Sequence, residues 1–232
     1  METIENVNIP KHIGIIMDGN RKWAKANNKN IAEGYLRGQQ VFDEVCLNCI
    51  EIGIPYLTTF AFSLENLKRS DFEIRSLLDL LFGKLRDEQW FAENNIRVYF
   101  AGAINLFSEH EQKILHDLST VTSKCSGLNV TIALNYDGYD EIINALNQII
   151  KKKDIIKKVS EETIDKYLYT SHLPPLDLII RTANIQRLTR FLLWKSPYAE
   201  CIFLKKYWPD FTKDDFIEAI NEYGKRERRY GK

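Results

Sequence analysis

The stretch Met17-Asp18-Gly19-Asn20-Arg21-Lys22-Trp23 decides how the rest of this 232-residue chain is read. An apolar run, His12–Met17, leads into it, and a pattern typical of a helix begins near Lys22. A strand followed by a short polar turn and a helix directs backbone N–H groups and a helix N-terminus at an anion. An acid within such a turn suits a divalent cation that lies between the acid and a phosphate. We therefore predict a metal-assisted phosphate or diphosphate site at the end of the first strand.

Composition limits the class of protein. Lysine plus arginine and aspartate plus glutamate both number 32, so the net charge is zero, whereas a general nucleic-acid binder carries a basic excess. We expect no nucleic-acid partner. No apolar run approaches the roughly 20 residues that a membrane span needs, and the polar, acidic segment Met1–Pro10 is not a signal peptide. We expect a cytoplasmic protein, either soluble or peripheral on a membrane surface. Cys46 and Cys49 are expected to be small apolar residues on a helix face.

Strand and helix patterns alternate along the whole chain. This alternation predicts a single α/β domain, residues 1–232, with a mainly parallel six-stranded sheet flanked by helices. The expected strands are 12–17, 55–62, 96–101, 128–136, 176–180 and 201–204. The expected helices are 22–51 with a break near 27–30, then 71–94, 105–124, 139–153, 161–171 and 211–223.

Polar residues gather at the ends of these expected strands. They are Asp18 and Asn20 after the first strand, Ser63, Glu65, Asn66 and Arg69 after the second, Arg181 and Arg187 after the fifth, and Glu200 before the sixth. Two arginines suit a diphosphate, which accepts bidentate guanidinium bonds. Two acids, Asp18 and Glu200, would share a Mg²⁺ ion that also holds phosphate oxygens. Each residue alone is more often a cap or a surface ion pair, so the prediction rests on the set.

The segment Phe72–Leu85 is apolar around much more than one helical stripe. It is either a helix buried on two sides of the core or one wall of an apolar tunnel between sheet and helices. Such a tunnel would hold a hydrocarbon tail beside the diphosphate site. The chain contains neither G-x-x-x-x-G-K-[ST] nor G-x-G-x-x-G, so the ordinary nucleotide-binding folds are not favoured.

Three stretches together resemble the cis-prenyltransferases, the family that includes undecaprenyl and dehydrodolichyl diphosphate synthases. They are residues 17–24 (MDGNRKWA), 61–69 (AFSLENLKR) and 181–194, which begins Arg181-Thr182 and ends Leu188-Thr189-Arg190-Phe191-Leu192-Leu193-Trp194. The resemblance continues through Tyr198-Ala199-Glu200, Tyr207-Trp208-Pro209-Asp210-Phe211 and Arg229-Tyr230-Gly231, in order and over nearly the whole chain. Arg21, where bacterial members usually have Gly, resembles the eukaryotic branch.

The resemblance implies a reaction in which isopentenyl diphosphate is condensed, in cis geometry, onto a farnesyl-type allylic diphosphate to give a medium- or long-chain polyprenyl diphosphate. It implies catalytic roles for Asp18, Asn66 and Arg69, and Mg²⁺ between Asp18 and Glu200. The substrate-binding residues that it implies are Gly19, Asn20, Arg21, Lys22, Trp23, Ser63, Glu65, Arg181, Arg187, Thr189, Arg229 and Gly231. The last two would reach the isopentenyl site of a second copy, which favours a self-sufficient homodimer.

The chain departs from the family pattern at several positions. The family usually has Arg where Ile31 stands and His where Tyr35 stands, and the usual Asn or Asp before Phe191 is Arg190. These changes affect the affinity and identity of the donor more than the class of reaction. A second interpretation is a non-catalytic polyprenyl-binding protein or a partner subunit of a heteromeric prenyltransferase. Such subunits typically lose the acid of the first turn, and Asp18 is present, so the enzyme is favoured.

Overall fold

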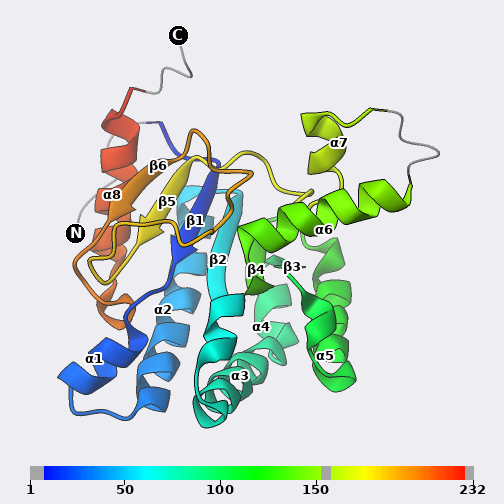
Figure 1. The fold of residues 1–232 in the computed structure, drawn as a ribbon. Helices are drawn as coiled ribbons and strands as arrows, with labels where there is room; N and C mark the ends of the chain where they lie inside the picture. Colours follow the sequence, from blue (N-terminus) through cyan, green and yellow to red (C-terminus); the bar gives the residue numbers. More distant parts are fainter. Residues whose placement is uncertain (1–7, 153–157, 228–232) are drawn as a thin grey trace.

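The computed structural model describes residues 8–152 and 158–227, which form one α/β domain built on a six-stranded sheet (Figure 1). The strands are β1 (His12–Ile16), β2 (Tyr56–Ser63), β3 (Arg97–Ala101), β4 (Asn129–Tyr136), β5 (Leu178–Arg181) and β6 (Glu200–Phe203). Their order is β3-β4-β2-β1-β5-β6, and every neighbouring pair is parallel. The predicted α/β class, strand number and parallel sheet are confirmed.

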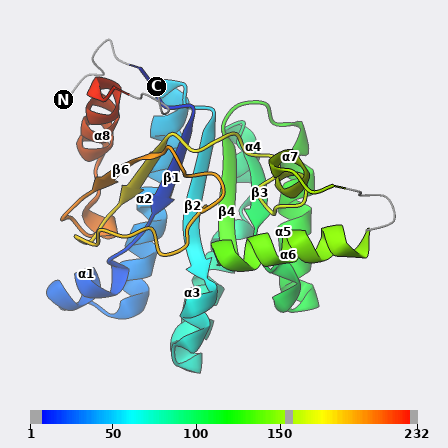
Figure 2. The same ribbon diagram turned by 45° about the horizontal axis from the view of Figure 1, so that its top comes forward.

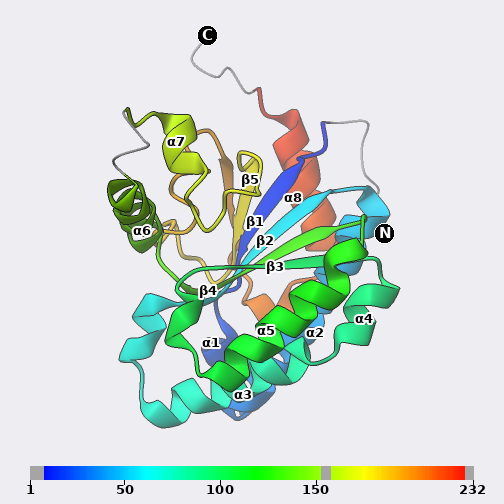
Figure 3. The same ribbon diagram turned by 90° about the vertical axis from the view of Figure 1, so that its right-hand side faces the viewer.

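Helices cover both faces of this sheet. They are α1 (Asn20–Ala26), α2 (Ile31–Ile52), α3 (Asp71–Leu85), α4 (Glu88–Glu93), α5 (Glu109–Val121), α6 (Gly138–Lys151), α7 (Glu161–Asp165) and α8 (Lys213–Lys225). Short 3₁₀ turns are η1 (Leu64–Lys68), η2 (Ile104–Leu106), η3 (Thr122–Lys124) and η4 (Trp208–Asp210). Figure 3 shows α6 and α7 on one side and α2, α4, α5 and α8 on the other. Because both faces are covered, β1 and β5 are buried along their whole length, which explains their continuous apolar sequence.

The helix boundaries differ from the predicted ones where side chains cap the backbone. The expected helix 71–94 is two helices, since α3 ends at Leu85 and the carboxylate of Asp87 accepts the Trp90 N–H (3.3 Å) to begin α4. The expected helix 105–124 begins only at Glu109, after a capping box at Ser108. Similarly, Thr212 caps α8 at Lys213, and α7 ends at Asp165 rather than at residue 171. The predicted break near residues 27–30 is confirmed, with Asn30 capping α2.

Two further expectations are met within the described residues. Cys46 and Cys49 are free thiols of α2 and are fully buried, so their C-x-x-C spacing reflects a helix face packed on the core. Among residues 8–152 and 158–227, no helix has the length and apolar character needed to span a membrane.

The carboxyl edge of the sheet is where the candidate site lies. Figure 2 shows α1 and α3 beyond this edge, below the arrowheads of the strands. The position of α1 depends on a close approach to α2, because a Cβ added at Gly34 would lie 2.5 Å from the Asn20 backbone oxygen and 3.1 Å from the Ala24 Cβ. Only glycine at this position of α2 permits the contact, so the glycine fixes where the first turn of the site stands.

We predict that Gly34→Ala lowers the free energy of unfolding by about 1–3 kcal/mol, because the added methyl group collides with backbone atoms that cannot rotate away. Gly83→Ala is the matched control: it also lies within a helix, but a Cβ there meets nothing within 4 Å. That variant should gain about 0.5–1 kcal/mol from helix propensity alone. Urea unfolding followed by circular dichroism measures both values. If Gly34→Ala were as stable as Gly83→Ala, the packing of α1 on α2 described above would be wrong.

Candidate active site

Asp18 stands two residues beyond β1, and its backbone is fixed on both sides. Its N–H donates to Oγ1 of Thr182 (3.0 Å), while that hydroxyl donates to the Asp18 carbonyl (2.6 Å). The backbone N–H of Trp208 donates to the same carbonyl (2.9 Å). Thr182 is fully buried and directly follows β5. The acid that the sequence singled out is therefore held by segments from the middle and the end of the chain.

The carboxylate of Asp18 pairs with Arg181, the last residue of β5. Arg181 Nη2 donates to Asp18 Oδ2 at 2.9 Å; the arginine side chain is 4% exposed and the aspartate side chain 32%. Arg181 Nη1 also donates to Thr189 Oγ1 (2.6 Å) and to the carbonyl oxygen of Arg187. The structure thus brings together Asp18, Arg181 and Thr189 as predicted. The side chain of Arg187 is exposed, and its contact with Arg181 is through the backbone.

The loop after β5 holds Thr189 in an unusual backbone conformation. Ala183, Asn184, Thr189, Arg190 and Leu192 all have φ between 46° and 70°, a region that costs non-glycine residues energy and is frequent at functional sites. Hydrogen bonds anchor the loop at both ends: Ala183 N–H donates to the Lys206 carbonyl (2.7 Å), and the Arg190 carbonyl accepts from the N–H of Gly138 (2.9 Å).

The rest of the first turn is built from residues with separate tasks. Gly19 has φ 110°, and a Cβ there would lie 2.8 Å from the Tyr207 ring, so glycine is required. The Trp23 indole donates to Asp210 Oδ1 (2.6 Å) and fixes α1 to η4. The Asn20 amide donates to the Met17 carbonyl (3.3 Å), while its own Oδ1 is buried without a partner among the described atoms. Arg21 and Lys22 are exposed.

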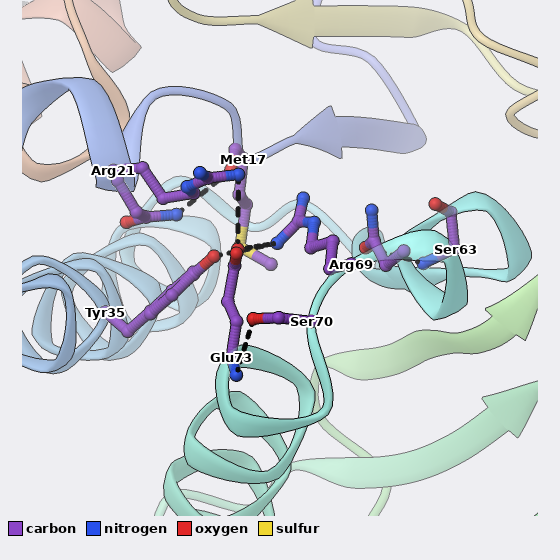
Figure 4. Close-up of polar contacts among 9 residues, drawn as sticks. Met17, Arg21, Tyr35, Ser63, Arg69, Ser70 and Glu73 are labelled. Atoms are coloured by element: carbon purple, nitrogen blue, oxygen red, sulfur yellow. Dashed lines mark hydrogen bonds and ion pairs between the residues drawn. The ribbon is translucent and has the colours of Figure 1, made fainter.

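Arg21 and Arg69 meet at the carboxylate of Glu73, in the first turn of α3. Arg21 Nη1 and Arg69 Nη1 each lie 3.2 Å from Glu73 Oε1, and Arg69 Nη1 also donates to the Tyr35 hydroxyl at 2.8 Å. Figure 4 shows these side chains converging on Glu73 at the start of α3. Burial raises the pKa of the Tyr35 phenol, so it stays protonated.

Sequence reasoning missed Glu73 because its spacing from Ser70 resembles a capping box. The structure shows half of that motif: Ser70 Oγ accepts the Glu73 N–H (3.4 Å), but the Glu73 carboxylate pairs with arginines instead of turning back to the cap. An arginine four residues earlier, at position 69, is the sequence signal for this alternative. Asn66, predicted to be catalytic, uses its Oδ1 to accept the Ser63 N–H (3.1 Å), and Glu65 is exposed.

An apolar pocket of about 110 Å³ opens beside these polar groups. Met17, Asn20 and Tyr35 line one part of it, and other residues of α2, β2 and α3, with one residue each from β4 and η4, line the rest. The remaining lining residues are Gly38, Gln39, Phe42, Thr59, Phe60, Ala61, Leu77, Leu80, Leu81, Lys84, Leu85, Ile132 and Trp208. The apolar character of α3 therefore has two causes, since Phe82 is buried in the core while Leu77, Leu80 and Leu81 face the pocket.

Glu200 does not join Asp18, so the prediction that both acids of one chain hold one ion is wrong. Glu200 begins β6 and pairs in register with Leu178, whereas Arg181, the partner of Asp18, stands at the opposite end of β5. Three residues of strand separate the two edges by about 10 Å. The first residue of a parallel strand lies on the edge opposite to residues that follow strands. Glu200 Oε2 instead accepts from Arg226 Nη1 (2.7 Å), just after α8.

The remaining donor set fits one kind of metal site. Within residues 8–152 and 158–227, no group of three or more His, Cys, Asp or Glu side chains could enclose an ion. Asp18 offers one partly exposed carboxylate at the edge of the sheet. Mg²⁺ is commonly held by one or two carboxylates together with substrate phosphates and water. The residues therefore fit an ion that arrives with a diphosphate. Arg229 and Gly231 lie outside the described residues.

The chain is similar to known proteins that act on prenyl diphosphates. The model of a family described as "putative undecaprenyl diphosphate synthase" matches residues 16–231. An isoprenyl transferase of Thermotoga maritima is 42% identical over 226 residues, covering 96% of this chain and 97% of that protein. A tritrans,polycis-undecaprenyl-diphosphate synthase (geranylgeranyl-diphosphate specific) of Thermococcus kodakarensis is 37% identical, covering 100% of this chain and 90% of that protein.

The fold is also similar to solved structures of prenyl diphosphate synthases. Lavandulyl diphosphate synthase from Lavandula x intermedia, in complex with dimethylallyl diphosphate, superposes with a TM-score of 0.92 at 29% identity, over 97% of this chain and 99% of that one. A probable undecaprenyl diphosphate synthase of Campylobacter jejuni superposes with a TM-score of 0.82 at 32% identity, over 97% and 100%. With the Asp18–Arg181 pair beside an apolar pocket, these likenesses show that the chain belongs to the undecaprenyl diphosphate synthase family of prenyltransferases.

Proposed function

We propose that this prenyltransferase condenses isopentenyl diphosphate onto a farnesyl-type allylic diphosphate, with Mg²⁺, and extends the product into the apolar pocket as a medium- or long-chain polyprenyl diphosphate. The observation that carries the proposal is a juxtaposition. Asn20 and Tyr35 line the pocket; the Asn20 amide donates to the carbonyl of Met17, the residue before Asp18, and the Tyr35 hydroxyl accepts from Arg69. A molecule with a charged head and a long hydrocarbon tail matches this arrangement.

Two anionic heads have separate positions at the carboxyl edge. The allylic diphosphate would lie against the first turn, residues 18–23, where Arg21 and Arg69 supply guanidinium groups and the pocket receives the tail. Isopentenyl diphosphate would lie against Arg181, Arg187 and Thr189, which one loop holds together. The named allylic ligands of two similar proteins, geranylgeranyl and dimethylallyl diphosphate, support the donor class. Ile31 is exposed at the start of α2 and supplies no charge, so Arg21 and Arg69 would hold the donor diphosphate.

The chemistry asks these residues to stabilise a leaving group. As the bond between the allylic carbon and its diphosphate breaks, negative charge grows on the departing oxygens, and pre-placed guanidinium groups stabilise that charge. A Mg²⁺ ion bound between Asp18 and the phosphates would act as a Lewis acid there. The isopentenyl double bond forms the new carbon–carbon bond, and the resulting carbocation loses a proton to an oxygen of the departed diphosphate. Asn66, whose Oδ1 is committed to Ser63, would act through its amide NH₂, next to Arg69.

The contacts of Asp18 argue against the alternative of a non-catalytic polyprenyl-binding protein or partner subunit. The Asp18 carboxylate pairs with Arg181, and hydrogen bonds with Thr182 and Trp208 fix the Asp18 backbone at the sheet edge. A protein that only binds lipid has no use for an acid held in this way. The product is too apolar for water, so we infer that the enzyme acts in the cytoplasm and releases it at a membrane surface, as a peripheral protein.

We also propose that the enzyme is a homodimer that forms through α6. Tyr139, Ile143, Leu146 and Ile150 are 55%, 56%, 37% and 64% exposed, and their spacing places them on one face of the helix. An exposed apolar stripe of this length is a typical protein-interaction surface. Arg190 links the stripe to the isopentenyl loop, since its guanidinium lies 4.5 Å from the Tyr139 ring centroid. A second copy on α6 would therefore stand beside Thr189, which is where Arg229 and Gly231 of that copy are expected.

Asp18→Asn should lower turnover at least about 100-fold. The Mg²⁺ ion would lose the carboxylate proposed to hold it beside the leaving diphosphate. The fold should persist, since the Asn oxygen still accepts from Arg181. The assay incubates purified protein with labelled isopentenyl diphosphate, Mg²⁺ and either farnesyl or geranylgeranyl diphosphate, and counts butanol-extractable label. Glu33→Gln, an exposed acid on α2, is the matched control. No product from the natural protein with either donor would overturn the enzyme proposal, and full turnover by Asp18→Asn would overturn the role of the acid.

Replacing Ile143 and Ile150 together by Glu should convert the dimer to a monomer, because four charges would face each other across a symmetric apolar contact. Sedimentation velocity measures the change in mass. The control is Val121→Glu on α5, which also places a charge on an exposed apolar position, 48% exposed, and should leave the mass unchanged. A dimer that persists in the Ile143/Ile150 variant would exclude α6 as the contact.

A further inference from the structure

Glu73 is the one acid of the site that faces two arginines at once. Its carboxylate oxygen Oε1 lies 3.2 Å from Nη1 of Arg21 and 3.2 Å from Nη1 of Arg69. The two arginines come from different elements, the first helix and the loop after η1, and Figure 4 shows them on either side of the carboxylate. These are the guanidinium groups proposed to hold the donor diphosphate, and a carboxylate oxygen accepts from both, as a phosphate oxygen would.

We propose that Glu73 is a counter-ion that competes with diphosphate for Arg21 and Arg69 and so promotes the release of inorganic diphosphate after each condensation. The inference rests on the proposed function. Carboxylate and phosphate oxygens accept the same charge-assisted N–H bonds from a guanidinium group. A bound diphosphate must therefore displace Glu73, and when the cleaved diphosphate departs, the arginines regain a partner instead of being left unpaired.

The three side chains differ in how firmly they are held. The Glu73 side chain is 12% exposed, and its residue lies in the first turn of α3, where a carboxylate is stabilised by the helix N-terminus. Arg69 is 28% exposed and also donates to Tyr35. Arg21 is 53% exposed on a long, flexible side chain. In this proposal the Arg21 guanidinium group exchanges between two partners, the fixed Glu73 carboxylate and the bound diphosphate. Tyr35 meanwhile keeps Arg69 at the pocket.

This exchange is useful because the proposed reaction repeats, with one isopentenyl unit added in each cycle. An enzyme that adds several isopentenyl units must empty the donor diphosphate position before the lengthened chain can occupy it as the next donor. Two arginines without a counter-ion would bind the cleaved diphosphate tightly and slow each turn. Glu73 weakens that binding without removing the arginines that stabilise the leaving group. Glu73 is thus a positioning residue and touches neither substrate nor the reacting atoms.

Glu73→Gln should bind inorganic diphosphate about threefold to tenfold more tightly, because two partly exposed ion pairs no longer oppose binding. Isothermal titration of the intact protein with inorganic diphosphate and Mg²⁺ measures this. Asp79→Asn removes a carboxylate from an exposed position of the same helix and should leave the affinity unchanged. In a double-mutant cycle, Arg21→Gln should weaken binding more in the Glu73→Gln protein than in the natural one, since Glu73 no longer occupies Arg21.

Kinetics separates this role from a merely structural one. Glu73→Gln should lower both KM for the allylic donor and kcat, and inorganic diphosphate should inhibit at a lower concentration. Equal or weaker binding of diphosphate by Glu73→Gln, in a variant that melts at the natural temperature, would overturn the proposal. If that variant melts early, Glu73→Asp provides the same comparison with its charge retained: diphosphate affinity that stays natural supports the counter-ion, and a gain equal to that of Gln contradicts it. Titration needs no prenyl transfer, so an inactive natural protein would contradict the proposed function alone.

Discussion

The buried guanidinium group of Arg181 is the constraint on which the site depends. A cation at the end of a central parallel strand is costly unless it is paired and its N–H groups are used. Arg181 meets that requirement with the Asp18 carboxylate, 163 residues away in sequence, and with Thr189 and the Arg187 carbonyl. These partners bring the turn after β1 and the loop after β5 to one point. The position of the Asp18 carboxylate and the shape of the loop after β5 therefore follow from how the Arg181 guanidinium group is paired.

The parallel sheet determines what can gather around this arginine. Residues that follow strands meet at the carboxyl edge, and those that precede strands meet at the other edge. Asp18, Arg69, Arg181 and Thr182 share the first edge, while Glu200 lies on the second with Arg226. Between the edge and α3, the sheet leaves an apolar pocket against β2 and α2. The charged edge and the apolar pocket behind it together suit a molecule with a charged head and an apolar tail.

Much of this arrangement could be predicted from local sequence. The alternation of strand and helix indicated a parallel sheet, the acid in the turn 17–23 indicated a cation–phosphate site, and the apolar helix beginning near Phe72 indicated a pocket wall. The errors came from relations that local patterns do not contain. Glu200 was placed on the wrong edge because strand direction was not applied to a residue that precedes its strand. The spacing of Glu73 from Ser70 is local and indicates only a helix cap, whereas the pairing of Glu73 with Arg21 depends on α1 packing against α2 at Gly34.

We infer that one ligand occupies the polar edge and the apolar pocket together. A crystal structure of the protein with Mg²⁺ and a farnesyl diphosphate analogue with an uncleavable bond tests this most directly. We predict that the diphosphate lies between residues 18–23 and Arg69, with Arg21 moved from Glu73 onto the phosphate oxygens and the tail among Leu77, Leu80 and Leu81. A tail that lies outside the pocket, or a diphosphate that contacts neither arginine, would contradict it.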